Sequence, residues 1–183
     1  MANLGTKSLM ADMSVRYKWE PQRTNHFEVT ISKFDAATTE VISLAVSTFS
    51  LPNITNDPIE VPHGNSRIKF AGQASFGGSE SLEVIDYVGV DIEGIILGWK
   101  NQVYNPATDT MGLAAEYKRD IFVTEFSPDG KQLSKWQLEG AWPSGVAFGD
   151  TLSMDGSEVK KITMTIAYDK GYRVESTRSQ AGV

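Results

Sequence analysis

Two runs of alternating apolar and polar residues, separated by a tight turn, constrain the fold of this chain most. Residues 117–126 and 131–139 alternate with the two-residue period of a half-buried β-strand. Residues 127–130 between them read Ser-Pro-Asp-Gly, with proline and glycine where a type I turn prefers them. The segment is therefore predicted to form an antiparallel hairpin. Its second strand is expected to end at Trp142-Pro143, because proline cannot donate a hydrogen bond to the ladder.

The N-terminal half contains a second predicted hairpin. Residues 27–32 alternate cleanly, which indicates a half-buried strand. Residues 42–47 alternate again after a predicted loop over residues 35–39. Because the connection is short, these two strands are expected to pair with each other.

Three further strands are predicted over residues 67–70, 81–87 and 161–168. The first two are joined by residues 73–79, which are rich in Gly and Ser and are expected to form a turn. Residues 81–87 have apolar side chains on both faces, so this strand is expected to be covered on both sides.

A long excursion over residues 51–66 connects the predicted strands. It contains Pro52, Pro58 and Pro62, so it cannot be a central strand of a sheet. We interpret it as a partly extended loop. Most loops are shorter, and long loops are disproportionately functional.

One helix is predicted, over residues 91–103, with Asp91 as its N-cap. Its apolar residues follow the helical spacing of one buried stripe. This helix core stripe consists of Ile92, Ile95, Ile96, Trp99 and Val103. Gly94 and Gly98 lie on another side of the helix, and each weakens it by about 1 kcal/mol relative to Ala. They are either a tolerated weakness or a smooth strip where a second backbone approaches.

The predicted organisation is an N-terminal arm over residues 1–24, a β domain over residues 25–172 and a polar C-terminal tail over residues 173–183. The arm is either a disordered tail or a segment that docks on another subunit. Tyr17 and Trp19 favour the second interpretation. The fold class that follows is mainly β: an antiparallel two-sheet sandwich or barrel with one flanking α-helix and a long inter-strand loop.

Composition excludes several classes of function. The 183 residues carry a formal net charge of −6, and tight DNA binding needs clustered cations. The chain has no cysteine and only His26 and His63 as histidines, which excludes disulfides and disfavours a metal site. No secretion signal and no apolar run of about 20 residues is found. A soluble protein made in a cytoplasm is expected.

No catalytic constellation was found, so no catalytic, cofactor-binding or metal-binding residue is predicted, and the chain is not expected to be an enzyme. His63 lies in the proline-rich excursion and is expected to be an exposed loop residue. Nearby carboxylates are available in any acidic chain, and solvated faces are their default. Those considered are Glu80, Glu83, Asp86, Asp91 and Glu93.

Three short motifs stand out within this order of elements: Phe-Glu-Val at 27–29, Ala-Glu-Tyr-Lys at 115–118 and Ala-Trp-Pro at 141–143. Together with the order of the elements, these motifs resemble the tail tube protein of contractile, long-tailed bacteriophages. The resemblance runs over residues 25–172. Both chain ends match poorly. The resemblance implies two packed antiparallel sheets with a helix at the side, six copies closed into a ring, and rings stacked into a hollow tube.

The resemblance also implies partners: other copies of the chain, a tail sheath protein outside the tube, and a tape measure protein and then DNA passing through the bore without sequence-specific binding. No membrane and no cofactor are implied. The subunit would be a virion structural protein, assembled in the host cytoplasm and used in genome ejection. Related tubes occur in siphophage tails, tailocins and type VI secretion systems, and a tailocin or type VI tube is the alternative.

Physical arguments agree with self-assembly. Exposed sheet edges invite pairing with other chains, and ring closure removes them. The excursion is then the expected inter-ring contact loop, through Asn53, Asn56, Asp57, Glu60, His63 and Asn65. Six chains at −6 give about −36 per ring, so the bore is expected not to be positive and DNA would slide through it. A β-sandwich ligand binder or enzyme is a third hypothesis, which would require a deep polar pocket.

Overall fold

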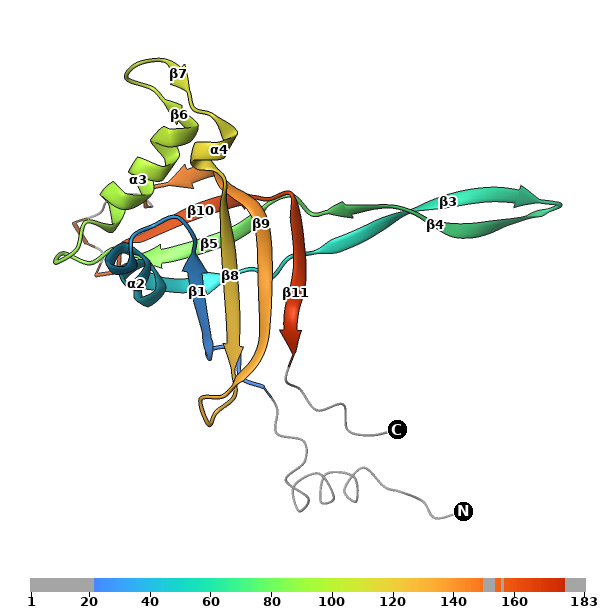
Figure 1. The fold of residues 1–183 in the computed structure, drawn as a ribbon, viewed down its shortest axis with the longest axis horizontal. Coiled ribbons are helices and arrows are strands. Elements are labelled where there is room, and N and C mark those ends of the chain that lie inside the picture. Colours follow the sequence, from blue (N-terminus) through green and yellow to red (C-terminus); the bar gives the residue numbers. More distant parts are fainter. Residues whose placement is uncertain (1–21, 150–153, 156, 177–183) are drawn as a thin grey trace, which may run out of the picture.

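The computed structural model describes residues 22–149, 154–155 and 157–176. Within these residues the protein consists mostly of antiparallel strands with a few helices, and a long hairpin projects from its body (Figure 1). The elements are β1 (Phe27–Ile31), α2 (Ala36–Ala45), β2 (Val46–Phe49), β3 (Ile54–His63), β4 (Ser66–Phe76), β5 (Glu80–Ile85), α3 (Ile92–Val103), β6 (Tyr104–Asn105), β7 (Thr110–Met111), α4 (Ala114–Tyr117), β8 (Arg119–Phe126), β9 (Gln132–Ala147), β10 (Lys161–Ala167) and β11 (Lys170–Ser176).

The body is a two-layer β-sandwich in which β9 belongs to both layers. The first half of β9 pairs with β8 and β11, and β8 pairs with β1. The second half of β9 pairs with β10, which continues through β5 to β2. All of these pairings are antiparallel. The predicted fold class, mainly β with two antiparallel sheets and a flanking helix, is confirmed.

The long strand β9 passes from one layer to the other at Gly140. This residue has φ +64°, a conformation that L side chains rarely adopt, and a Cβ there would lie 2.3 Å from Asp169 Oδ2. The prediction that Trp142-Pro143 ends the strand is wrong. Pro143 pairs with Ile166 beside an irregularity in the ladder, where a missing donor is tolerated.

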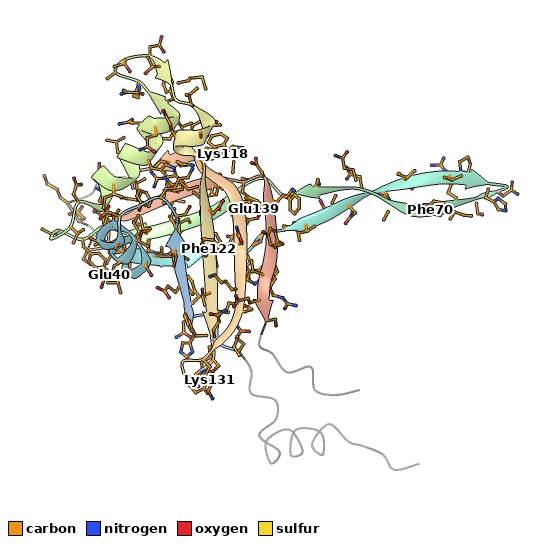
Figure 2. The ribbon with its side chains drawn as sticks, in the orientation of Figure 1. Glu40, Phe70, Lys118, Phe122, Lys131 and Glu139 are labelled. Atoms are coloured by element: carbon orange, nitrogen blue, oxygen red, sulfur yellow. The ribbon has the colours of Figure 1, made fainter. Side chains whose placement is uncertain are left out.

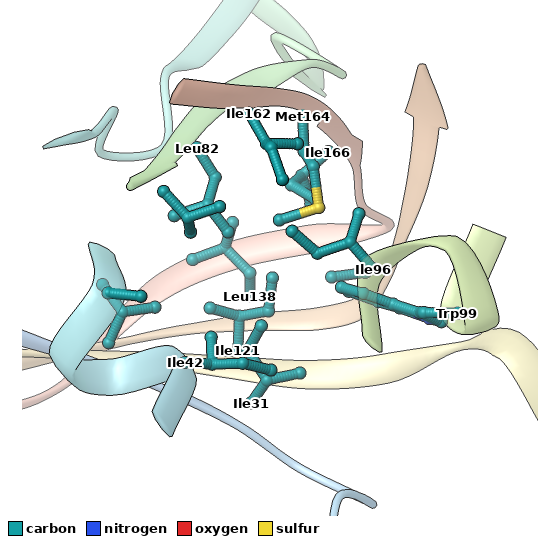
Figure 3. Packing of buried hydrophobic residues seen from close by; sticks show 14 of the residues in the cluster. Ile31, Ile42, Leu82, Ile96, Trp99, Ile121, Leu138, Ile162, Met164 and Ile166 are labelled. Atoms are coloured by element: carbon teal, nitrogen blue, oxygen red, sulfur yellow. The ribbon is translucent and has the colours of Figure 1, made fainter. Parts of the chain in front are cut away.

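A single hydrophobic core fills the space between the layers and the helices (Figure 3). Both layers contribute, as does α3 through the indole of Trp99, which is 2 % exposed. Burying apolar side chains of this size contributes about 1.5–3 kcal/mol each, so the core dominates the stability of the body. The largest fully buried side chains include Ile31, Leu82, Trp99, Ile121, Leu138, Ile162, Met164 and Ile166.

The segment before β2 is a helix, so the predicted loop over 35–39 is wrong, and so is the predicted strand over 42–45; residues 46 and 47 do belong to a strand, β2. Asp35 caps α2: its carboxylate accepts hydrogen bonds from the backbone N–H of Thr38 at 3.1 Å and from the Thr38 hydroxyl at 2.6 Å. Ile42 and Ala45 on one face of the helix are buried. The predicted pairing between these segments is also wrong, since β1 pairs with β8 and β2 with β5.

The helix predicted over 91–103 is α3, and Asp91 caps it by accepting from the N–H of Gly94 at 2.8 Å. The residues of the predicted stripe face the core: Ile92, Ile96, Trp99 and Val103 are buried, and Ile95 is partly buried and packs against them. A Cβ on Gly94 would lie 2.2 Å from Asp91 Oδ2, whereas a Cβ on Gly98 would meet nothing within 4 Å. Gly94 therefore makes room for the cap.

The proline-rich excursion is not a loop but the first strand of a long hairpin, which we call the arm (residues 54–76). The predicted short strand over 67–70 and residues 73–76 of the predicted turn are parts of its second strand, β4, and only residues 77–79 connect β4 to β5. Each strand of a two-stranded ribbon has an open edge, where proline is tolerated. Gly64, at φ +59°, begins the turn at the tip of the arm. The backbone carbonyl oxygen of Asp57 comes close to Gly72, and a Cβ at this position would lie only 2.3 Å from that oxygen.

Two smaller differences concern β5 and the C-terminus. β5 buries Leu82 and Val84 on one face, but Ser81 is exposed on the other, so the strand is not covered on both sides as predicted. β11 runs to Ser176, so residues 173–176 belong to the sheet rather than to a tail. The rest of the predicted C-terminal tail lies outside the described residues, as does the predicted N-terminal arm up to residue 21. Among those that are described, no helix is long and apolar enough to cross a membrane.

Candidate functional site

The root of the arm is fixed to the body by a buried carboxylate. Glu80 is 8 % exposed, and its Oε1 accepts hydrogen bonds from the hydroxyl of Tyr168 at 3.0 Å and from the backbone N–H of Asn53 at 3.3 Å. Burial, followed by the hydrogen bond to Glu80, raises the pKa of Tyr168 to about 12. Pro52 packs so closely on Gly171 that a Cβ there would lie 2.5 Å from it. The arm therefore leaves the body in a defined direction.

One face of the distal arm is apolar and uncovered. Ile59 lies opposite Phe70, and Val61 lies opposite Ile68, so the four side chains share one face of the ribbon. Their exposed fractions are 56 %, 55 %, 45 % and 45 % respectively. Phe70 lies far out on the arm, away from the body (Figure 2). We call Ile59, Val61, Ile68 and Phe70 the apolar arm face.

The opposite face of the arm is charged. The carboxylate of Glu60 forms ion pairs with Arg67 at 2.9 Å and Lys69 at 3.2 Å. Hydrogen bonds from Arg67 and then Lys69 lower the pKa of Glu60. Because these groups are exposed, each pair contributes little to stability. Their effect is to keep this face polar, so the distal arm is amphipathic.

The six predicted contact residues are spread from the root of the arm, through its first strand, to its tip. Asn53 lies at the root, and Asn56 and Asp57 lie at a register shift partway along the arm. Glu60 belongs to the charged face, and His63 and Asn65 lie at the tip. Sequence reasoning missed the apolar arm face, because Ile68 and Phe70 become its members only when β4 is recognised as the partner of β3.

The outer strands of the body form a second candidate surface. Within the described residues, β1, β2 and β11 each pair with one other strand, so each presents one open edge. Open edges are templates for further strand pairing. A groove of about 590 Å³ lies between β1 and β2. We call it the β1–β2 groove, and its lining residues are Thr24, Asn25, Phe27, Val46, Ser47, Thr48, Phe49, Leu51, Val123 and Glu125.

The carboxylates considered for catalysis have structural roles. Glu80 anchors the arm, and Asp91 caps α3. Asp86 and Glu93 both bind Lys160, whose pKa is raised first by the hydrogen bond that its ammonium donates to Glu93 and then by the one that it donates to Asp86. No group of three or more metal-ligating side chains occurs in the part of the chain that the structure describes. The arrangement of the described residues offers surfaces for association.

Comparison with known proteins finds solved structures with a similar fold but no match to the sequence. No protein-family model and no curated protein matches the chain. A chain in the cryo-EM structure of the anti-feeding prophage cap, described as a tube terminating cap, has a TM-score of 0.67 and 18 % identity, over 86 % of this chain and 93 % of that chain.

Two further solved structures share the fold. A chain of the sheath–tube complex of an extracellular contractile injection system, PVC, has a TM-score of 0.63 and 17 % identity, over 91 % of this chain and 97 % of that chain. The SPP1 tail tube has a TM-score of 0.53 and 12 % identity, over 84 % of this chain and 78 % of that chain. The resemblance to tail tube proteins seen in the sequence is confirmed at the level of the fold.

Proposed function

We propose that this protein is the structural subunit of a phage tail tube, in which hexameric rings stack around a bore that conducts the genome during ejection. The observation that carries the proposal is the arm, which holds four apolar side chains about half exposed on one face. An isolated two-stranded hairpin is marginally stable in water at best. The arm therefore needs a covering surface, and no other part of the described chain provides one.

A second copy of the chain is the partner that fits the arm best. The arm of one copy would lie on the body of another, which is a heterologous contact, and repeating such a contact generates rings or filaments. In this arrangement the arm is the inter-ring contact. The apolar arm face packs against the neighbour, and the polar residues from Asn53 to Asn65 border the contact.

Ring closure would use the open edges of the body. A heterologous ring requires two different surfaces on each copy, and the edge of β11 and the β1 side of the same layer are different. Joining these edges around a ring leaves none of them exposed, as in a closed barrel. This arrangement accounts for sheet edges that a monomer would otherwise leave open.

The charge of the chain suits a conduit. The net charge of −6 gives a ring that does not attract phosphates, so DNA would pass without being held. A tape measure protein would occupy the bore before the DNA, and a sheath protein would surround the tube. The role proposed is structural and not enzymatic, and the assembly would form in the host cytoplasm.

A tube from another contractile system is the second candidate. The TM-scores favour it: 0.67 and 0.63 for chains of the anti-feeding prophage cap and the PVC sheath–tube complex, against 0.53 for the SPP1 tail tube. The two functions differ in what travels through the bore. Purified particles that contain DNA and this chain would support the phage function, and DNA-free injection particles would support the alternative.

Adjacent substitutions on opposite faces of the arm test the proposal. Phe70→Glu places a charge on the apolar arm face, whereas Ala71→Glu places the same charge on the exposed polar face. We expect wild type and Ala71→Glu to form tubes on electron microscopy grids, and Phe70→Glu to remain folded by circular dichroism but not to form long tubes. Equal assembly of both variants would overturn the arm as the contact.

A further inference from the structure

The turn between β5 and α3 exposes apolar side chains. Tyr87 and Val90 form an isolated antiparallel bridge, and the N–H of Val90 donates to Tyr87 O at 3.1 Å. Val88 lies at the tip of this turn and is fully exposed. Turns favour Gly, Pro, Asn, Asp and Ser, so an apolar β-branched residue at the tip does not serve the turn itself.

A further exposed apolar residue lies beside this turn. The N–H of Asp86 donates to Lys160 O at 3.0 Å, which places the segment before β10 next to the turn. Val159 in this segment is 62 % exposed. Exposed apolar side chains that gather in one place mark sites of association, whereas single ones need no explanation. We call Tyr87, Val88, Val90 and Val159 the turn patch.

The turn patch has an acidic border. Residues 85–93 and 157–160 carry four carboxylates, those of Asp86, Asp91, Glu93 and Glu158, and one cation, Lys160. Lys160 binds Asp86 and Glu93. The excess of negative charge favours a partner that brings cations together with apolar side chains.

The distal arm has the matching composition. Its apolar face includes Ile68 and Phe70, and Arg67 and Lys69 alternate with them along β4. Over residues 59–70 these two cations accompany one carboxylate, Glu60. The two strands of the ribbon lie about 5 Å apart, so the long side chains of Arg67 and Lys69 can reach round its edge while the apolar face is covered.

The arm and the turn patch lie at opposite ends of the molecule. Figure 1 shows the arm extending from one end of the body along the longest axis and the turn between β5 and α3 at the other end. One copy therefore cannot cover its own arm with its own turn patch, but two copies in head-to-tail order can. The contact uses neither the β1 edge nor the β11 edge, so both edges remain for ring closure.

We propose that the turn patch receives the apolar arm face of a copy in the next ring. This inference rests on the proposed function and adds to it the surface that covers the arm. Val88 packs against Phe70 and its apolar neighbours, and Arg67 and Lys69 lie beside the acidic border. Each copy then gives its arm to one neighbour and its turn patch to another.

Cysteine pairs test this contact, because the chain has no cysteine of its own. Phe70→Cys combined with Val88→Cys places one thiol on each surface. Ala71→Cys with Val88→Cys is the matched control, because Ala71 is exposed on the opposite face of the arm. Phe70→Cys with Leu44→Cys tests α2 as the receiving surface instead, since Leu44 is exposed there.

The variants are oxidised after assembly and separated on denaturing gels without reductant. We expect the Phe70–Val88 pair to form a ladder of linked copies at least about tenfold faster than either of the other pairs, since a disulfide requires two thiols that lie close together. Equal rates, or faster linkage of the Phe70–Leu44 pair, would overturn the proposal.

The outcomes separate this inference from the proposed function. Tubes in which the Phe70–Val88 pair stays unlinked would overturn the turn patch as the receiving surface and leave the tube intact. A chain that forms no tubes would overturn the proposed function. Oxidation of the same pair in concentrated solution would then still test the contact, because a ladder supports it and monomers alone overturn it.

A charge on the turn patch gives a second measurement. Val88→Glu is expected to keep the wild-type midpoint of thermal unfolding, because Val88 is fully exposed, but to lose long tubes as is expected for Phe70→Glu. Leu44→Glu places the same charge on an exposed apolar position of α2 and is expected to keep long tubes. Tubes of wild-type length formed by Val88→Glu would overturn the proposal.

Discussion

The guanidinium carbon of Arg119 lies 3.8 Å from the centroid of the Phe34 ring, and Arg119 is only 5 % exposed. The group donates to Gln102 Oε1 at 3.1 Å and to Ser32 O at 3.4 Å, and its Nε has no hydrogen-bond partner among the described residues. Burial lowers the pKa of Arg119. Through these contacts one cation joins β8, α3 and the β1–α2 connection.

Arg119→Met is therefore expected to leave the free energy of unfolding within about 1 kcal/mol of wild type, because a hydrophobic side chain of similar volume can replace a buried cation. Arg119→Ala removes the same charge but leaves a cavity, and is expected to lower it by about 2–4 kcal/mol. Urea denaturation of both variants measures the difference. Equal losses would show that the charge itself stabilises the fold.

Tyr168 makes the free energy of unfolding depend on pH in the alkaline range. Its pKa rises from 10.0 to about 12 in the folded protein, so folding favours the protonated hydroxyl. This contribution, about 2–3 kcal/mol, is fully present below pH 10 and is lost as the pH rises from about 10 to 12. We expect Tyr168→Phe to be less stable at pH 8 and to lose less stability over that range. If the difference in the free energy of unfolding between wild type and Tyr168→Phe stayed constant from pH 8 to 12, this prediction would be contradicted.

The two glycines of α3 are expected to respond in opposite directions. Gly98→Ala adds a methyl group in open space and should stabilise the helix by about 0.5–1 kcal/mol. Gly94→Ala collides with the Asp91 cap and should destabilise the subunit by about 1 kcal/mol. Thermal unfolding of the subunit measures both effects. If Gly98→Ala stabilises the subunit but prevents assembly, the glycine strip is where a second backbone approaches.

Trp99 combines packing with a hydrogen bond, since its Nε1 donates to Tyr117 O at 2.8 Å. Trp99→Ala is expected to lower the free energy of unfolding by about 3–5 kcal/mol, through the cavity that it creates. Ile95→Ala, at a partly buried position of the same stripe, should lower it by less. Denaturation midpoints of the two variants test the order, and the reverse order would contradict the packing described for α3.

The parts of the fold that the sequence predicted are those where local signals and burial agree. The turn at residues 127–130 closes as expected, with the N–H of Gly130 donating to Ser127 O at 2.9 Å. The spacing of Ile92, Ile96 and Trp99 fits only a helix, and Asp91 marks its start. These signals are local, so they could be interpreted without knowing the rest of the chain.

The errors arose where two interpretations share one pattern. Alternation over residues 42–46 is too short to separate a strand from a helix, and Asp35, which decides between them, was assigned to a loop. In the arm, residues 73–76 were assigned to a turn because residues 73–79 are rich in Gly and Ser, although residues 73–76 continue β4. The candidate contact surface was therefore located on the correct segment, but its apolar face was missed, because that face depends on long-range pairing of β3 with β4.

Negative-stain electron microscopy of the purified protein tests the central claim most directly, with a variant in which residues 54–76 are replaced by a short Gly-Ser linker. The account predicts six-fold rings stacked into tubes for the intact chain, and folded subunits without long tubes for the variant. A monodisperse monomer at high concentration, with neither rings nor tubes on the grid, would contradict it.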